Sequence, residues 1–130
     1  MKPGTTILYY AKPRNEAGVR LRKAVEEAAG KEGIETCVTI QELFRRLCRP
    51  RMGIAATVLF AVDKGELFQF MMLGDMLHEV PLIFILPDNE EETVSLGHSL
   101  YPRLISYGNS DFADVAAVLK RKVAQGEGRA

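Results

Sequence analysis

The chain has 130 residues, of which 47% are hydrophobic and 26% are charged, a balance that suits one folded domain with a single ordinary core. Its 17 basic and 17 acidic side chains cancel, so no global field attracts a nucleic acid or an anionic membrane. The apolar runs reach only about eight residues, too short to span a bilayer, and the N-terminus lacks a signal-peptide core. We therefore expect a cytoplasmic domain over residues 1–124, followed by a flexible tail at 125–130.

The N-terminal segment predicts a strand, a helix and a second strand. Residues 6–11 form a continuous apolar run rich in β-forming residues, which is typical of a strand covered on both faces. Asn15 is a suitable N-cap for a helix with one apolar face, and Gly30 is a natural stop. Residues 34–38 predict a second, shorter strand.

The central segment continues this alternation. Thr39 and Glu42 have the spacing of a capping box, in which the two side chains satisfy free backbone amides at a helix start. The amphipathic helix that follows is ended by Pro50. Residues 56–62 predict a third buried strand, which ends at Asp63.

The C-terminal half adds two strands and three helices. Residues 64–78 predict one continuous helix, and residues 81–86 give the strongest strand signal in the chain. A short, weakly patterned helix follows an acidic run at 90–92. Residues 103–107 predict a fifth strand, and a last helix places its apolar face along residues 112–123.

Five strands that alternate with helices predict an α/β fold. Right-handed crossovers place helices on both faces of a parallel sheet, which gives a three-layer sandwich. The common order for five strands is 2-1-3-4-5, with a ligand crevice at the carboxyl ends of the first and third strands.

The order, lengths and strand character of these elements resemble the receiver domains of two-component signalling over roughly residues 5–124. The resemblance implies an acidic pair after the first strand, which holds Mg²⁺, and a phospho-acceptor Asp at the end of the third. Here Ala11 and Lys12 follow the first strand, although Mg²⁺ requires carboxylate oxygens. Ala61 aligns with the phospho-acceptor, and Asp63 lies two residues further on the same side of the strand.

Two more positions depart from the receiver pattern. Receivers end the fourth strand with Ser or Thr and the fifth with Lys, where this chain has Leu86 and Tyr107. Phosphoryl transfer to Asp needs a metal ion and cations around the transferred group. We therefore expect Asp63 to cap the helix that follows it, and to pair with Lys12, rather than to accept a phosphoryl group.

The crevice itself is a candidate ligand site. Its expected residues are Lys12, Arg14, Asp63, Asp88 and Tyr107. Lys12 and Arg14, with the free amides of the following helix, would hold a small anion such as a nucleotide or a phosphate-bearing metabolite. The segment has no Gly-rich phosphate loop, so this reading stands as an alternative.

Two surfaces are candidates for docking. On the helix at 64–78, Phe68, Met72 and Met76 form a second apolar stripe, away from the face assigned to the core. This stripe predicts a protein partner or a homodimer, unless a wide apolar arc is simply buried within the monomer. A basic patch is formed by Arg45, Arg46, Arg49 and Arg51, which we interpret mainly as a solvated helix face.

The sequence offers neither a catalytic constellation nor a metal site. Cys37 and Cys48 fall in apolar patterns and predict two buried thiols. Two Cys and two scattered His are too few ligands for a metal centre, and no nucleophile stands at a suggestive spacing from a base. We therefore expect no cofactor, no metal ion and no enzymatic activity.

These observations favour a pseudo-receiver, a receiver-like module that binds a protein partner or itself without phosphoryl transfer. One alternative is an atypical phosphorylatable receiver that uses Asp63. The other is a sensor of small anionic ligands at the crevice of Lys12 and Arg14. We expect neither a membrane nor a nucleic acid as a partner.

Overall fold

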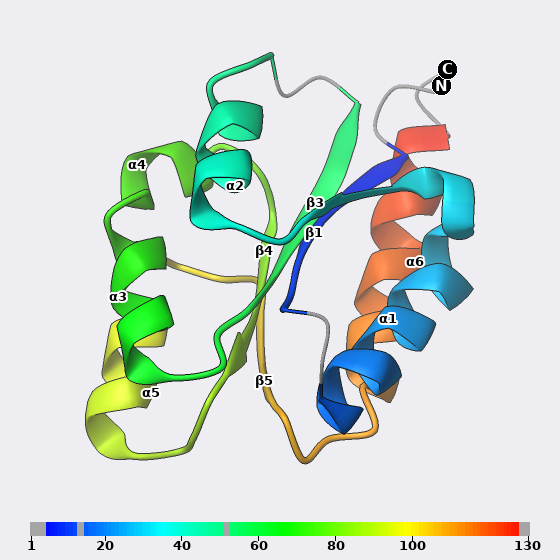
Figure 1. Cartoon of the computed structure of the whole chain (residues 1–130). Coiled ribbons are helices and arrows are strands. Elements are labelled where there is room, and N and C mark those ends of the chain that lie inside the picture. Colours follow the sequence, from blue (N-terminus) through cyan, green and yellow to red (C-terminus); the bar gives the residue numbers. More distant parts are fainter. Residues whose placement is uncertain (1–4, 13–14, 51–52, 128–130) are drawn as a thin grey trace.

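The computed structural model describes residues 5–12, 15–50 and 53–127, and it has the expected α/β architecture (Figure 1). The strands are β1 (Thr6–Tyr10), β2 (Ile34–Cys37), β3 (Ile54–Phe60), β4 (Leu82–Leu86) and β5 (Leu104–Tyr107). The helices are α1 (Glu16–Ala29), α2 (Ile40–Leu47), α3 (Lys64–Met71), α4 (Gly74–Leu77), α5 (Glu91–His98) and α6 (Ala113–Glu127), with a 3₁₀ turn, η1, at Lys31–Gly33.

All five strands pair in parallel in the order β2-β1-β3-β4-β5, which confirms the predicted fold. The three central strands, β1, β3 and β4, are buried along their whole length. Helices cover both faces of the sheet, and neighbouring strands cover both edges of a central strand, so these strands are shielded from solvent.

Two hydrophobic clusters fill the space on either side of the sheet. One lies between the sheet and α2, α3, α4 and α5, and the other between the sheet and α1 and α6 (Figure 1). Alternation along β1 directs Leu8 and Tyr10 into the first cluster, and Ile7 and Tyr9 into the second. Tyr10, at the carboxyl end of β1, therefore lies on the side of the sheet that carries α3.

The predicted helix starts are confirmed by their side-chain caps. The Oδ1 atom of Asn15 accepts a hydrogen bond from the backbone N–H of Gly18 at the start of α1. At α2, the Thr39 hydroxyl accepts from the Glu42 N–H at 3.1 Å, and it donates to the Glu42 carboxylate at 3.3 Å. These local bonds set where the chain turns from strand to helix on each face.

The continuous helix expected at 64–78 was wrong, because the chain breaks between α3 and α4. Leu73 leaves the helical conformation, with φ −96° and ψ 9°, and its N–H bonds to the Phe70 carbonyl at 2.9 Å in a tightened last turn. Leu73 and Leu77 both lie in the core. Phe68 and Met76 consequently belong to separate helices, so the apolar stripe expected there is not continuous.

Two further expectations need correction. α6 extends through Glu127, so residues 125–127 of the expected tail belong to a helix. Cys37 is buried as expected, but Cys48 is exposed, because it forms the C-cap of α2 rather than a position on its apolar face. Neither α6 nor any other described helix combines the length and the apolar character that crossing a membrane requires.

The core on the α3 side predicts a large cost for truncating Phe70. This fully buried ring packs edge-on against the rings of Tyr10 and Phe84, at centroid distances of 5.0 and 5.8 Å. We expect Phe70→Ala to lower the free energy of unfolding by about 3–5 kcal/mol, measured by urea denaturation. Met72→Ala, which truncates an exposed side chain next to the same helix, should change it by less than about 0.5 kcal/mol. Equal losses in the two variants would contradict this assignment of the core.

Candidate functional site

The crevice expected from the strand order lies where β1 and β3 end side by side. Tyr10 of β1 pairs in register with Leu59 of β3, so the loops that follow both strands start at the same edge of the sheet. Lys12 follows β1, and residues 61–63 connect β3 to α3. Since β2 and β3 lie on opposite sides of β1, the chain leaves this edge in two directions, which opens the crevice.

A buried carboxylate, that of Glu66, occupies this crevice. Its Oε2 atom accepts a hydrogen bond from the Tyr10 hydroxyl at 2.9 Å and lies 3.4 Å from the ammonium nitrogen of Lys12. Its Oε1 atom accepts from the backbone N–H of Val62 at 3.0 Å. Burying a carboxylate is costly without such partners, and here both oxygens have them. The Lys12 side chain, 56% exposed, supplies the balancing charge from the rim.

The position of Glu66 follows from the cap of α3. The Oδ1 atom of Asp63 accepts from the backbone N–H of Glu66 at 2.8 Å, which fixes the first turn of the helix. Three residues after an N-cap, an acidic side chain can reach back to the amides before the helix. The cap predicted for Asp63 is thus confirmed, whereas the predicted pair between Lys12 and Asp63 was wrong, because Lys12 pairs with Glu66.

Sequence reasoning missed Glu66 and Tyr10 as parts of the crevice. Asp63 and Glu66 have the spacing of a capping box, and this signal could have placed Glu66 near the end of β3. Nothing local in the sequence indicates Tyr10 as its partner, because 56 positions separate the two residues. Burial and the hydrogen bond to Glu66 raise the pKa of Tyr10 far above its usual value, so its hydroxyl stays protonated and donates.

Ala61 and Asp63, the two residues near the position expected for a phospho-acceptor, have structural roles. Ala61 is fully buried, and its backbone N–H donates to the Ile85 carbonyl at 3.0 Å, which extends the ladder between β3 and β4. Asp63 is exposed, and one of its carboxylate oxygens is engaged in the cap of α3. The described residues contain no group of three His, Cys, Asp or Glu side chains arranged to hold a metal ion.

The four described candidates for the crevice, Lys12, Asp63, Asp88 and Tyr107, do not line one common hollow. Asp88 and Tyr107 line a hollow of about 600 Å³ at the ends of β4 and β5, and Lys12 is not part of it. In the turn before α5, Asp88 Oδ1 accepts from the Glu90 N–H at 3.0 Å. Arg14 lies outside the described residues. Of the two residues expected to form an anion site, Lys12 is described, and its charge faces Glu66.

The two candidate docking surfaces also differ from expectation. Phe68 is 48% exposed and Met72 87% exposed, whereas Met76 is partly buried against the core.

In the expected basic patch, Arg46 forms an ion pair with Glu35 and donates to the Pro50 carbonyl at 3.1 Å. Arg45 is exposed, and Arg49 borders a hollow at the opposite end of the sheet from the crevice. Arg51 lies outside the described residues.

Comparison with solved structures identifies the class of fold. No protein-family model and no curated protein matches the chain. Its structure is similar to that of a protein from Burkholderia pseudomallei described as pilus assembly-related, with a TM-score of 0.66 and 16% identity over 94% of this chain and 92% of that one. It is also similar to a response regulator from Thermotoga maritima, with a TM-score of 0.62 and 11% identity over 92% of this chain and 98% of that one. The fold is therefore receiver-like, as the sequence predicted.

The Lys12–Glu66 pair predicts an energetic coupling between two residues from different βα loops. Lys12→Met leaves the buried carboxylate without its cation, and we expect it to lower the free energy of unfolding by about 1–2 kcal/mol, because the exposed ammonium is partly screened. Glu66→Gln should restore part of this loss in the double variant, giving a coupling of about 1 kcal/mol in a double-mutant cycle. Urea denaturation at neutral pH measures the free energy of unfolding of the parent chain, the two single variants and the double variant.

A matched control is the exposed pair of Lys120 with Glu27, which has an N–O distance of 3.0 Å. Lys120→Met should change the free energy of unfolding by less than about 0.5 kcal/mol. Strictly additive effects of Lys12→Met and Glu66→Gln would show that the two charges do not interact.

Proposed function

We propose that the domain is a pseudo-receiver, an interaction module that works without accepting a phosphoryl group and without enzymatic activity. The observation that carries the proposal is the Lys12–Glu66 ion pair inside the crevice. In the receiver domains that the sequence resembles, an acidic pair in this region holds Mg²⁺. Here an ammonium group neutralises the one buried carboxylate of the crevice, so the local charge does not favour a divalent cation.

The chemistry of phosphoryl transfer supports the same conclusion. Transfer to an Asp needs a metal ion and cationic groups that stabilise the charge of the transferred phosphoryl group. Asp63 is the one carboxylate near the expected acceptor position that is exposed, but it caps α3. The nearest described cation of the crevice, Lys12, faces Glu66 instead. Asp63 therefore lacks the surroundings of a phospho-acceptor.

A module of this kind needs a docking surface, and the exposed apolar end of α3 supplies a candidate. Phe68 and Met72 expose large apolar side chains, which are uncommon on a surface without a partner when they cluster. Met is also adaptable at binding surfaces. We propose a protein partner at this surface, with a second copy of the chain as the form to be tested first. A cytoplasmic location, expected from the sequence, is part of this proposal.

Incubation with acetyl phosphate and Mg²⁺ tests the absence of phosphoryl transfer. We expect intact-mass measurement to show no added phosphoryl group, because the crevice offers no metal-binding carboxylate pair beside Asp63. The Asp63→Asn variant is the matched control. A phosphoryl mass on the parent chain that is absent from Asp63→Asn would favour the atypical receiver and overturn the proposal.

Sedimentation at high protein concentration tests the homodimer. If Phe68 and Met72 form its interface, the parent chain sediments as a dimer, and the double variant Phe68→Glu, Met72→Glu sediments as a monomer with unchanged circular dichroism. The charge-matched variant Gln41→Glu, Gln69→Glu changes exposed residues and should leave the dimer intact. A parent chain that is monomeric at these concentrations excludes self-association through α3.

A further inference from the structure

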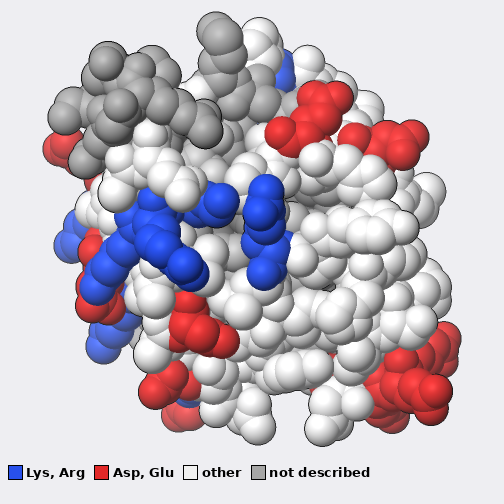
Figure 2. All heavy atoms as spheres, turned by 180° about the vertical axis from the view of Figure 1, so that it is seen from behind, with Lys and Arg blue, Asp and Glu red and all other residues white. Residues whose placement is uncertain are grey.

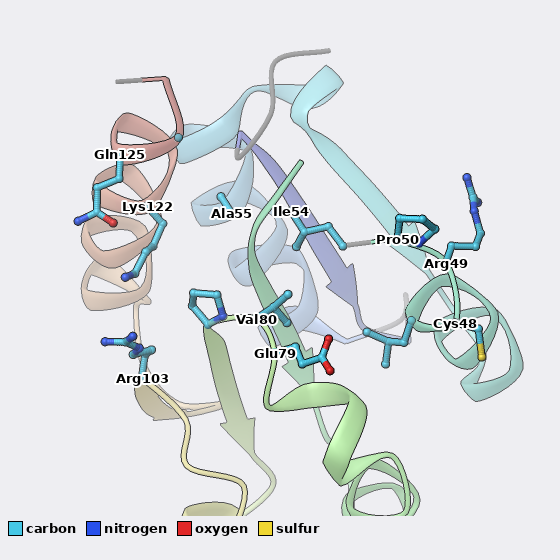
Figure 3. A pocket seen from close by; sticks show the side chains of 13 residues that line it. Cys48, Arg49, Pro50, Ile54, Ala55, Glu79, Val80, Arg103, Lys122 and Gln125 are labelled. Atoms are coloured by element: carbon cyan, nitrogen blue, oxygen red, sulfur yellow. The ribbon is translucent and has the colours of Figure 1, made fainter. Parts of the chain in front are cut away.

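A hollow of about 760 Å³ lies at the amino ends of β3, β4 and β5, at the opposite end of the sheet from the crevice (Figure 3). Its volume falls in the range of small-molecule sites, roughly 300–1,000 Å³. Its lining comes from the ends of α2 and α6, the starts of β3 and β5, and the segment before β4. Residues 51–52 lie outside the described residues.

One wall of this hollow is cationic. Arg103, which directly precedes β5, and Lys122 of α6 lie together on this wall with Gln125 (Figure 3). Across the hollow, Arg49 adds a third basic residue, although its side chain points away from the centre in this view. None of the three has an ion pair with a described acidic residue. Figure 2, which shows the rear face of the molecule, has Lys and Arg side chains grouped beside a broad area without charged groups.

Apolar side chains form part of the floor of the hollow. Leu47, Ile54 and Val80 line it and are buried, and Pro81 lies beside them. Apolar walls lower the local dielectric constant and strengthen the field of nearby unpaired charges. Among the described lining residues, Glu79 carries the one carboxylate, against three basic side chains. The hollow thus combines a partly apolar floor with an excess of positive charge at one wall.

A second hollow of the molecule lacks this excess of free charge. It lies near Lys12 between α1 and β2, with a volume of about 360 Å³. Two of its three basic residues are already neutralised, Lys12 by Glu66 and Arg22 by Glu26 at 3.1 Å. Among the described residues, the hollow at the amino ends of the strands therefore has more basic side chains without a described acidic partner than the hollow near Lys12 has.

We propose that this hollow binds a small amphipathic organic anion. The apolar body of the ligand would cover Ile54 and Val80, and its negative group would bind between Arg103 and Lys122. Both contributions are needed, because burial of the body supplies affinity that is not directional, and the charge-assisted hydrogen bonds set its orientation. This site is separate from the crevice and independent of whether Asp63 accepts a phosphoryl group.

Fluorescence titration of the full chain with anilinonaphthalene sulfonate, an aromatic anion of suitable size, tests the proposal. We expect saturable binding to one site, with a Kd that rises with salt because part of the affinity is electrostatic. Phenylnaphthylamine, which keeps the aromatic body but lacks the sulfonate, should bind at least about tenfold more weakly. The double variant Arg103→Gln, Lys122→Gln should weaken binding of the sulfonate by about tenfold or more, and bind the neutral probe as the parent does.

The control variant is Arg45→Gln, Arg121→Gln, which removes the same charge from exposed positions outside the hollow, one of them adjacent to Lys122. Its Kd for the sulfonate should stay within about twofold of the parent value. Circular dichroism and urea denaturation verify that both double variants are folded. Equal affinity of the parent chain for the two probes, or an unchanged Kd in Arg103→Gln, Lys122→Gln, would overturn the proposal, as would the absence of saturable binding.

Discussion

The buried carboxylate of Glu66 is the constraint around which one end of this molecule is organised. A carboxylate without water must find hydrogen-bond donors and a compensating charge. Glu66 obtains them from three segments: the Tyr10 hydroxyl at the end of β1, the Val62 amide after β3, and the Lys12 ammonium in the loop after β1. The segments at the ends of β1 and β3 and the start of α3 are thereby held together at a single group.

This arrangement also decides what the crevice can do. The fold places the carboxyl ends of β1 and β3 next to each other, which is where α/β sheets commonly bind ligands. In this chain the Lys12 ammonium pairs with the buried Glu66 carboxylate in the crevice, and one oxygen of Asp63 caps α3. The electrostatics of the crevice thus serve its own stability, and this supports a module that acts through its surface.

The two ends of the sheet differ in how their charges are balanced. At the carboxyl ends, Lys12 meets a buried acidic partner. At the amino ends, Arg103 and Lys122 border a hollow whose lining includes Ile54 and Val80, and neither cation has a described acidic partner. Unpaired cations against a low-dielectric wall attract an anion, whereas a satisfied pair does not. The same scaffold therefore carries a self-contained end and an end suited to a ligand.

The sequence by itself determined the order of strands and helices, the parallel sheet and the caps at Asn15, Thr39 and Asp63. These features depend on apolar periodicity and on capping residues a few positions apart, so they can be read within a short window. Only the tertiary structure decided that Lys12 pairs with Glu66, that the helix after Asp63 breaks at Leu73, and that Arg103 and Lys122 share a wall. Each of these depends on which distant segments meet in space: Tyr10 and Glu66 are 56 positions apart, and Leu73 packs in a core built from several strands and helices. A short sequence window cannot predict these long-range contacts, because they form and contribute stability only when the helices pack against the sheet.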